Sequence, residues 1–398
     1  MSDAPALNSS GTALGDNIQG FNDNLASQAG RPSAPCYQKD IDSMKVFRGF
    51  KHPGVATSCA LTIGNFDGVH RGHQAMLSLL RGEAAQRGVP SCVLTFEPHP
   101  RDFFAALHHK PELAPARVGT LRDKLEDLST CGVDQTIVLP FDARLASLTP
   151  EAFILNVLVK GLGTRYVLVG DDFRFGAQRA GDYATLDAAG ERLCFDVARM
   201  NSYEISYRHA LPAAQTEAAG TRRASDTAHG LRVSSSAVRQ ALGEGRMQDA
   251  ARLLGRPYCI SGHVVHGRKL GRSLGQDAQH PMGMRTLNLR FAHWKPAASG
   301  IFVVLVHGLA EKPLRGVANL GVRPSLDPND VNGGRVLLET HCLDWPQALG
   351  AEGAYGKIIR VELLHKLHDE LKYDGLDALT QGIRKDCDDA RAWLERRI

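Results

Sequence analysis

The chain has 398 residues, of which 43% are hydrophobic and 23% charged, a composition typical of a globular protein with room for two ordinary domains. Its 47 basic and 43 acidic residues leave a net charge of +4, which is too small to indicate a nucleic-acid or membrane partner. No apolar run approaches the ~20 residues that cross a bilayer, and no basic-then-apolar secretory signal opens the chain.

The eight cysteines are scattered, with no Cys-x-x-Cys pair. This spacing is typical of reduced, mostly buried thiols rather than of a disulfide framework or a zinc site. The cysteine pattern therefore predicts a cytoplasmic protein.

The first 43 residues are rich in Ser, Gly, Ala, Asn and Asp and lack a sustained hydrophobic period. We expect residues 1–43 to form a disordered tail. The alternative is that the working start is Met44, where ordered-looking sequence begins, and the sequence leaves both possibilities open.

Between about 45 and 200, apolar runs alternate with helical patterns. Strands are predicted near 59–64, 91–96, 135–139 and 165–170, and helices near 73–87, 120–131 and 150–160. This alternation predicts an α/β domain over 44–255 with a Rossmann-like parallel sheet. Ligands of such sheets bind beyond the carboxyl ends of the strands.

Two further segments complete the first domain. Residues from about 202 to 231 are polar and aperiodic, and we expect a surface insertion there. A serine cap within 233–242 then opens a short helix, and a second helical stretch covers about 246–254.

After Tyr258 the pattern changes to short β-like runs separated by turn residues. These runs lie at 259–265, 301–306, 314–319, 335–341 and 357–364. Their spacing predicts a small antiparallel β-barrel over 256–398, closed by a helix at about 375–396.

The most informative string is G-N-F-D-G-V-H-R-G-H at 64–73, between a predicted strand and a predicted helix. Glycines in such a turn let backbone N–H groups approach phosphates, and the helix N-terminus adds positive charge. We expect His70 and His73 to share one face of the first helical turn. No lysine follows the second glycine, which excludes the Walker-type phosphate loop. Taken alone, a histidine here is more often a cap or a surface residue.

The full string resembles the H-x-G-H signature of nucleotidyltransferases. It takes the longer form found in the prokaryotic bifunctional riboflavin kinase/FAD synthetase family. The resemblance implies that this domain adenylates FMN with ATP and releases pyrophosphate, with His70 and His73 as the catalytic donors. It also implies nucleotide contacts from five residues of the turn: Gly64, Phe66, Asp67, Gly68 and Gly72.

Three further segments carry the resemblance in the first domain. G-D-D-F-R-F-G at 170–176 resembles the second nucleotide motif, with Asp171 or Asp172 facing adenosine or metal; the alternative is a polar turn with solvated aspartates. F-E-P-H-P at 96–100 is expected to be a lid or a flavin-side loop, in which His99 has either a functional or a structural role. V-S-S-S-A-V-R resembles the family's I-S-S-T-x-x-R, which implies phosphate binding by Ser234, Ser235, Ser236 and Arg239; an ordinary helix cap is the alternative.

In the second domain, the segment 261–275 resembles the glycine-rich flap of riboflavin kinases, which implies ATP-phosphate contacts from Gly267, Lys269, Gly271 and Arg272. An insertion at 276–282 separates this flap from the T-L-N string at 286–288. Arg285, just before that string, stands where the family has proline. Thr286 and Asn288 map onto the pair that binds Mg²⁺; the alternative is that both are ordinary strand residues.

The strand around Glu339 resembles the one that carries the kinase's catalytic carboxylate. Alternation places Glu339 on the face opposite to Leu338 and Thr340, where it is either a base for the riboflavin 5′-hydroxyl or a solvated strand residue. G-V-A-N-L-G-V-R-P-S, which contains Asn319, resembles a loop lining the nucleotide and flavin site.

The sequence thus predicts an enzyme that phosphorylates riboflavin and then adenylates the FMN formed, with ATP and Mg²⁺ and with FMN and FAD as products. Its partners are expected to be small molecules only, and the chain a monomer or weak homo-oligomer. One rival is a single-activity enzyme, which would make FMN without FAD. Another is a flavin carrier, which would bind flavin without consuming ATP.

Overall fold

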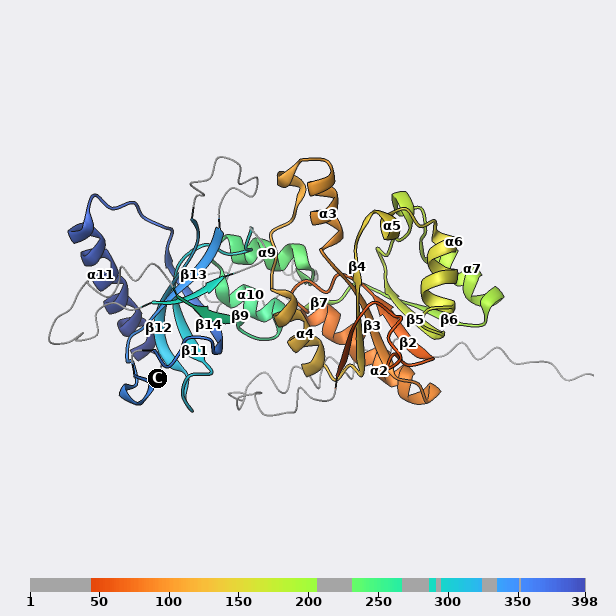
Figure 1. Ribbon diagram of the computed structural model, residues 1–398, viewed down its shortest axis with the longest axis horizontal. Helices are drawn as coiled ribbons and strands as arrows, with labels where there is room; N and C mark the ends of the chain where they lie inside the picture. Colours follow the sequence, from red (N-terminus) through yellow and green to blue (C-terminus); the bar gives the residue numbers. More distant parts are fainter. Residues whose placement is uncertain are drawn as a thin grey trace, which may run out of the picture. The chain divides into compact units, whose positions relative to one another are not determined.

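The computed structural model describes residues 44–205, 231–266, 286–290, 295–323, 335–350 and 352–397. The expected tail 1–43, most of the insertion at 202–231, and the segment 276–282 lie outside the described residues. The described chain contains a parallel sheet with covering helices and a closed antiparallel barrel (Figure 1).

The sheet has six parallel strands in the order β1-β4-β3-β2-β5-β6. The strands are β1 (Lys45–Arg48), β2 (Cys59–Ile63), β3 (Ser91–Glu97), β4 (Gln135–Pro140), β5 (Thr164–Gly170) and β6 (Asp196–Met200). The central strand β2 is buried at every residue, as expected for a strand covered on both faces.

Helices cover both faces of this sheet. On one face, α2 (Arg71–Arg87) and α4 (Leu121–Thr130) place Leu77 and Leu128 against Val93 of β3. On the other face, α6 (Pro150–Phe153), the π-helical turn η3 (Ile154–Val159) and α7 (Tyr183–Leu193) pack on β2, β4 and β5. Two further helices, α3 (Pro100–Leu107) and α5 (Ala143–Ala146), follow the carboxyl ends of β3 and β4.

Two helices close the first region. A two-residue pairing of β7 (Glu204–Ile205) with β8 (Leu231–Arg232) precedes α9 (Ser235–Gly243) and α10 (Met247–Leu254). The predicted serine cap is confirmed, because Ser234 Oγ accepts a hydrogen bond from the Ala237 N–H at 3.2 Å.

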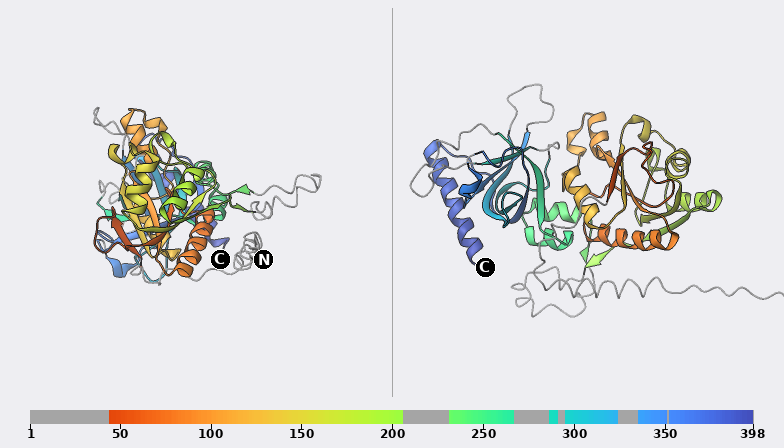
Figure 2. Two further views of the ribbon diagram at one scale, coloured as in Figure 1. Left: turned by 90° about the vertical axis from the view of Figure 1, so that its right-hand side faces the viewer. Right: turned by 60° about the horizontal axis from the view of Figure 1, so that its bottom comes forward.

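The barrel closes in the order β10-β13-β12-β11-β14-β9. Its strands are β9 (Tyr258–Val265), β10 (Leu287–Arg290), β11 (Gly300–His307), β12 (Leu314–Arg323), β13 (Arg335–Cys342) and β14 (Ile358–His368). The terminal helix α11 (Leu376–Glu395) lies along the outside of the barrel and buries Cys387 and Ala390 against Val303 (Figure 2).

The predicted fold class is confirmed: a Rossmann-like sheet and a small antiparallel barrel with a closing helix. Several elements were not predicted. The edge strands β1 and β6 contain no buried residue, and no apolar run marks them in the sequence. β10 has only four residues, and α3 buries only Ala105. The expected helix 150–160 is a short α-helix followed by a π-helical turn.

Candidate functional site

The turn between β2 and α2 is strained and close-packed. Phe66 and Val69 adopt positive φ angles of 48° and 37°, although neither is glycine. Such backbone conformations cost about 1–3 kcal/mol each and are found mainly where function requires them. Gly68, with φ 88°, cannot be replaced without a clash, since a Cβ there would lie 2.7 Å from Val118 Cγ1.

His70 and His73 stack at the start of α2, with ring centroids 3.7 Å apart and an angle of 15° between the planes. The predicted shared face is confirmed by this stacking, although His70 is the N-cap residue that precedes the first turn of the helix. Its Nδ1 accepts a hydrogen bond from the His73 N–H at 3.3 Å and so supplies the acceptor that the helix start lacks.

Burial keeps this pair uncharged. It lowers the pKa of His70 to about 4 and the pKa of His73 well below its usual value. Because His70 Nδ1 accepts a hydrogen bond, its ring proton is assigned to Nε2. His73 Nδ1 is buried without a hydrogen-bond partner in the described part of the chain. The site therefore presents two neutral imidazoles with unused hydrogen-bonding capacity.

Asp67 joins three segments that are far apart in sequence. Its carboxylate is 2% exposed and accepts hydrogen bonds from the Val118 N–H at 3.1 Å and from Arg239 Nη2 at 2.8 Å. Arg239 Nε also donates to Ala116 O at 2.7 Å, and Ser235 Oγ donates to Asp67 O at 3.0 Å. Asp67 therefore acts on the site by orienting Arg239, whose Nε and Nη2 bind Ala116 O and the Asp67 carboxylate.

The other predicted nucleotide contacts lie around this centre. Phe66 is buried with its ring against His73, 4.9 Å between centroids, and a Cβ on Gly72 would approach the His70 ring at 3.3 Å. Ser236 is exposed on the first turn of α9. At the end of β5, the Asp172 carboxylate is exposed and lies 3.9 Å from Arg232 Nη2.

Sequence reasoning missed two buried cations in the same region. Arg117 is 4% exposed and pairs with Asp102 at 2.8 Å and Glu97 at 3.3 Å, while its Nε makes no hydrogen bond among the described residues and lies 4.0 Å from Asp67 Oδ1. Lys124 is 3% exposed, and its Nζ donates to Thr95 Oγ1 at 3.4 Å. Burial lowers the pKa of Lys124 to about 8. One signal in the sequence could have indicated that Lys124 is buried: it stands four residues before Leu128, and residues four apart share one face of a helix.

His99 has a structural role in this structure. It is buried, and its Nδ1 caps α3 by accepting a hydrogen bond from the Arg101 N–H at 3.1 Å. Burial lowers the pKa of His99 to about 3, so the ring is neutral at ordinary pH. Of the two roles expected for His99, its contacts therefore support the structural one.

On the barrel, three predicted residues form a row across neighbouring strands. Glu339 of β13 stands opposite Asn288 of β10 on one side and Asn319 of β12 on the other. Directly opposed residues of antiparallel strands share one face, so these side chains lie together. Their neighbours Leu338, Leu289 and Leu320 point to the other face and form the apolar barrel interior.

The row carries oxygen and amide groups suited to phosphate chemistry. Asn288 is buried, and its Nδ2 donates to Thr286 O at 3.2 Å. The Asn319 Oδ1 is buried without a hydrogen-bond partner among the described residues. Gly267, Lys269, Gly271 and Arg272 of the expected flap lie outside the described residues.

The parallel sheet has a central strand that ends in the turn with the two stacked histidines, which is typical of a nucleotidyltransferase. The same chain contains a small barrel with a row of Asn, Glu and Asn, which is typical of a small-barrel kinase. Together these features define a nucleotidyltransferase fused to a kinase. Two family models match accordingly: FAD synthetase over residues 52–210 and riboflavin kinase over residues 254–394.

Among curated relatives, the bifunctional riboflavin kinase/FMN adenylyltransferase of Escherichia coli K12 is 41% identical over 345 residues, which cover 86% of this chain and 96% of the relative. The proteins of the same description from Pseudomonas fluorescens and Haemophilus influenzae are 39% and 36% identical, over 84% and 88% of this chain and 92% and 99% of their own lengths. The chain belongs to this family of bifunctional riboflavin kinase/FMN adenylyltransferases.

A solved structure also agrees in fold. The crystal structure of a protein described as a macrolide-efflux protein from Streptococcus pneumoniae has a TM-score of 0.61 and 23% identity, over 88% of this chain and 99% of that one. Within the described ranges, no helix combines the length and apolarity needed to cross a bilayer.

Proposed function

We propose that adenylyl transfer takes place at the N-terminus of α2 and that riboflavin phosphorylation takes place at the Asn-Glu-Asn row of the barrel. Family membership makes ATP, riboflavin, FMN and FAD the substrates and products. The observation that carries the first assignment is the bridge from Asp67 to Arg239 at 2.8 Å, which unites the turn, the Ala116 loop and α9 around one helix N-terminus.

In the first site, a phosphate oxygen of FMN attacks the α-phosphorus of ATP. The bond from that phosphorus to the bridging oxygen breaks, pyrophosphate leaves, and FAD forms. The imidazole N–H groups of His70 and His73, the Arg239 guanidinium and the serine-capped start of α9 would hold the phosphate oxygens. Removing one such donor typically slows the reaction by about 10²–10³-fold.

In the second site, Glu339 would accept the proton of the riboflavin 5′-hydroxyl as that oxygen attacks the γ-phosphorus of ATP and ADP leaves. Its register beside Asn288 and Asn319 supports this assignment. The expected flap residues Lys269 and Arg272 would add phosphate contacts.

The donor set beside Glu339 fits Mg²⁺. Thr286 and Asn288 offer hard oxygen atoms, and Mg²⁺ is usually held by one or two protein ligands together with substrate phosphates and water. The described residues contain no cluster of three or more His, Cys, Asp or Glu side chains placed to hold a metal by themselves. When bound, Mg²⁺ would neutralise charge on the transferring phosphate.

The compartment and the partners of the two reactions are inferred from the composition of the chain and the state of its cysteines. We place them in the cytoplasm, with small molecules as the only partners and the chain a monomer or weak homo-oligomer. Every cysteine in the described ranges is a free thiol, which supports a reducing compartment.

A coupled assay tests the assignment. The purified chain with riboflavin, ATP and Mg²⁺ should yield FMN and then FAD. His73→Ala should stop FAD formation and let FMN accumulate. Glu339→Ala should stop FMN formation while FAD still forms from added FMN.

Two results would contradict the proposal. One is FAD synthesis that is unchanged in His73→Ala, which would mean that the stacked histidines are not at the reacting phosphates. The other is loss of both activities in a well-folded Glu339→Ala protein, which would mean that the two sites are not separate.

A further inference from the structure

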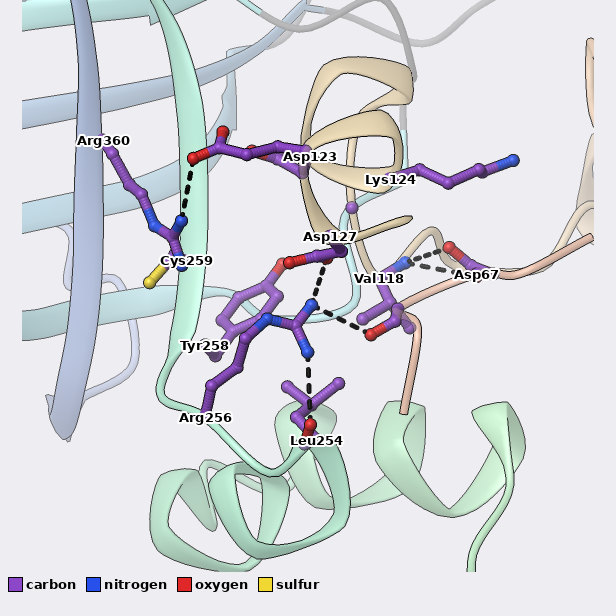
Figure 3. Close-up of a pocket in the computed structure, with 13 residues that line it drawn as sticks. Asp67, Val118, Asp123, Lys124, Asp127, Leu254, Arg256, Tyr258, Cys259 and Arg360 are labelled. Carbon is purple, nitrogen blue, oxygen red and sulfur yellow. Dashed lines mark hydrogen bonds and ion pairs between the residues drawn. The ribbon is translucent and has the colours of Figure 1, made fainter. Parts of the chain in front are cut away.

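Arg256 lies two residues beyond the end of α10, and its side chain turns back toward the strained turn of the first site (Figure 3). Its guanidinium donates to Gly68 O at 3.0 Å, to Val69 O at 3.4 Å and to Leu254 O at 3.2 Å. It also forms an ion pair with the Asp127 carboxylate of α4. One side chain therefore connects the turn, the end of α10 and α4.

Two of the three carbonyls that Arg256 contacts belong to Gly68 and Val69, the two residues immediately before His70. Both adopt left-handed backbone conformations, which for the β-branched Val69 is costly. Gln74 reinforces the same connection, since its Nε2 donates to Val69 O at 2.8 Å and to Leu254 O at 2.7 Å. Two side chains thus fix Val69 O and Leu254 O in place.

Asp127 anchors the guanidinium from the opposite side. Its side chain is 13% exposed, and burial raises the pKa of Asp127 to about 6, whereas the Arg256 charge acts in the opposite direction and favours the carboxylate. Asp127 and Arg256 line a small pocket together with Asp67 and Gly68 of the turn. Arg256 is thus held in a defined position beside the turn, 26% exposed.

We propose that Arg256 is a positioning residue for adenylyl transfer: by fixing the Gly68 and Val69 carbonyls, it sets the direction of the His70 ring and of the α2 N-terminus. It does not touch the reacting phosphates itself. This inference rests on the proposed role of His70. The riboflavin kinase match begins at residue 254 and the FAD synthetase match ends at 210, so a residue from the kinase-matched sequence would serve the other reaction.

The test compares Arg256→Gln and Arg256→Lys with Arg246→Lys, an exposed arginine just before α10 that pairs with Glu244 and Asp249. Lysine retains a charge for Asp127 but lacks the fork that reaches several carbonyls at once. We expect kcat for FAD synthesis from FMN to fall about 10- to 100-fold in Arg256→Gln, and less in Arg256→Lys, because small misplacements of reacting groups are costly. The KM values and riboflavin kinase activity should stay within about twofold of wild type, and Arg246→Lys should behave as wild type.

A spectroscopic signature separates positioning from general stability. In ligand-free Arg256→Lys, which keeps the positive charge that itself helps to lower the pKa of His70, the NMR titration midpoint of His70 should still rise from about 4 toward its ordinary value of 6.5, because a loosened turn exposes the ring. An unchanged kcat, or equal losses of both activities with a lowered melting temperature and an unmoved His70 midpoint, would overturn the inference. Failure of the proposed function itself would appear separately, as unchanged FAD synthesis in His73→Ala.

Discussion

The two sites of this chain are assembled in opposite ways. The first grows from one contiguous string, residues 64–73, whose turn is held by buried polar contacts. The second is assembled by register: Asn288, Asn319 and Glu339 come from three strands and meet because the strands pair as they do. The first site is therefore built on one local string that distant residues hold in place, and the second is fixed by strand pairing across the barrel.

This difference also appears in what surrounds the reactive groups. His70, Asp67 and Arg117 are 6%, 2% and 4% exposed, and each is oriented by neighbouring contacts. Glu339 is only partly buried, and the expected flap residues at 267–272 precede β10 in the sequence. A substitution in the first site should therefore disturb a preset geometry, whereas one in the second should mainly remove a ligand.

The strongest expected effect tests the preset geometry. Arg239→Lys keeps a positive charge for Asp67 but cannot span Asp67, Ala116 O and a phosphate together. FAD synthesis from FMN should fall by about 10²-fold, with riboflavin phosphorylation unchanged. Steady-state rates of the two half-reactions, measured separately, check this result.

Arg87→Lys is the matched control, since Arg87 pairs with Glu83 and Asp196 at the far end of α2. It should leave both rates as in wild type. A normal rate of FAD synthesis in Arg239→Lys would show that the bridge to Asp67 serves folding only.

A smaller effect is expected at the barrel. Asn288→Ala removes an amide oxygen next to Glu339 without creating a buried unpaired charge. The Mg²⁺ concentration for half-maximal riboflavin phosphorylation should rise about 10- to 100-fold, as is typical when one part of a metal site is lost. FAD synthesis from FMN should not change.

Lys357→Ala provides the control on the barrel surface, since Lys357 is exposed just before β14. An unaltered Mg²⁺ requirement in Asn288→Ala would remove Asn288 from the metal site. It would also weaken the argument from register, because Asn288 is one of the two residues directly opposite Glu339.

The same contrast explains what the sequence could predict. The turn, both histidines and the serine cap follow from local patterns, and the structure places the histidines at the N-terminus of α2 and the serine cap at the N-terminus of α9. The roles of Arg117, Lys124 and Arg256 do not follow from such patterns, because each acts through contacts across long sequence separations. A charged residue looks solvent-exposed in the sequence until tertiary packing buries it.

For the barrel, alternation alone placed Glu339 opposite to Leu338, but no local signal places it next to Asn288 and Asn319. That adjacency depends on pairings between residues up to about fifty positions apart, which a period of two residues does not encode. There the prediction came from resemblance to known kinases, and the strand register agrees with it.

The prediction with the smallest effect at neutral pH concerns the stability of the folded chain and its dependence on His99, a buried histidine near the first site. The folded pKa of His99 is about 3, far below its unfolded value of about 6.5. As the pH falls below about 6.5, the unfolded chain therefore takes up a proton that the folded chain resists, and stability declines. Between pH 7.5 and pH 5, His99 alone should lower the free energy of unfolding by about 2 kcal/mol.

His99→Asn keeps a side-chain acceptor for the Arg101 N–H and removes the titrating ring. Urea unfolding at pH 7.5 and pH 5 should show a smaller loss of stability in this variant than in wild type, while FAD synthesis at pH 7.5 is retained. His108→Asn changes an exposed histidine at the end of the same helix and should leave the pH dependence unaltered. Equal pH dependence in wild type and His99→Asn would mean that His99 is protonated as readily in the folded chain as in the unfolded one. The buried, uncharged character inferred for the first site would then not extend to the loop after β3.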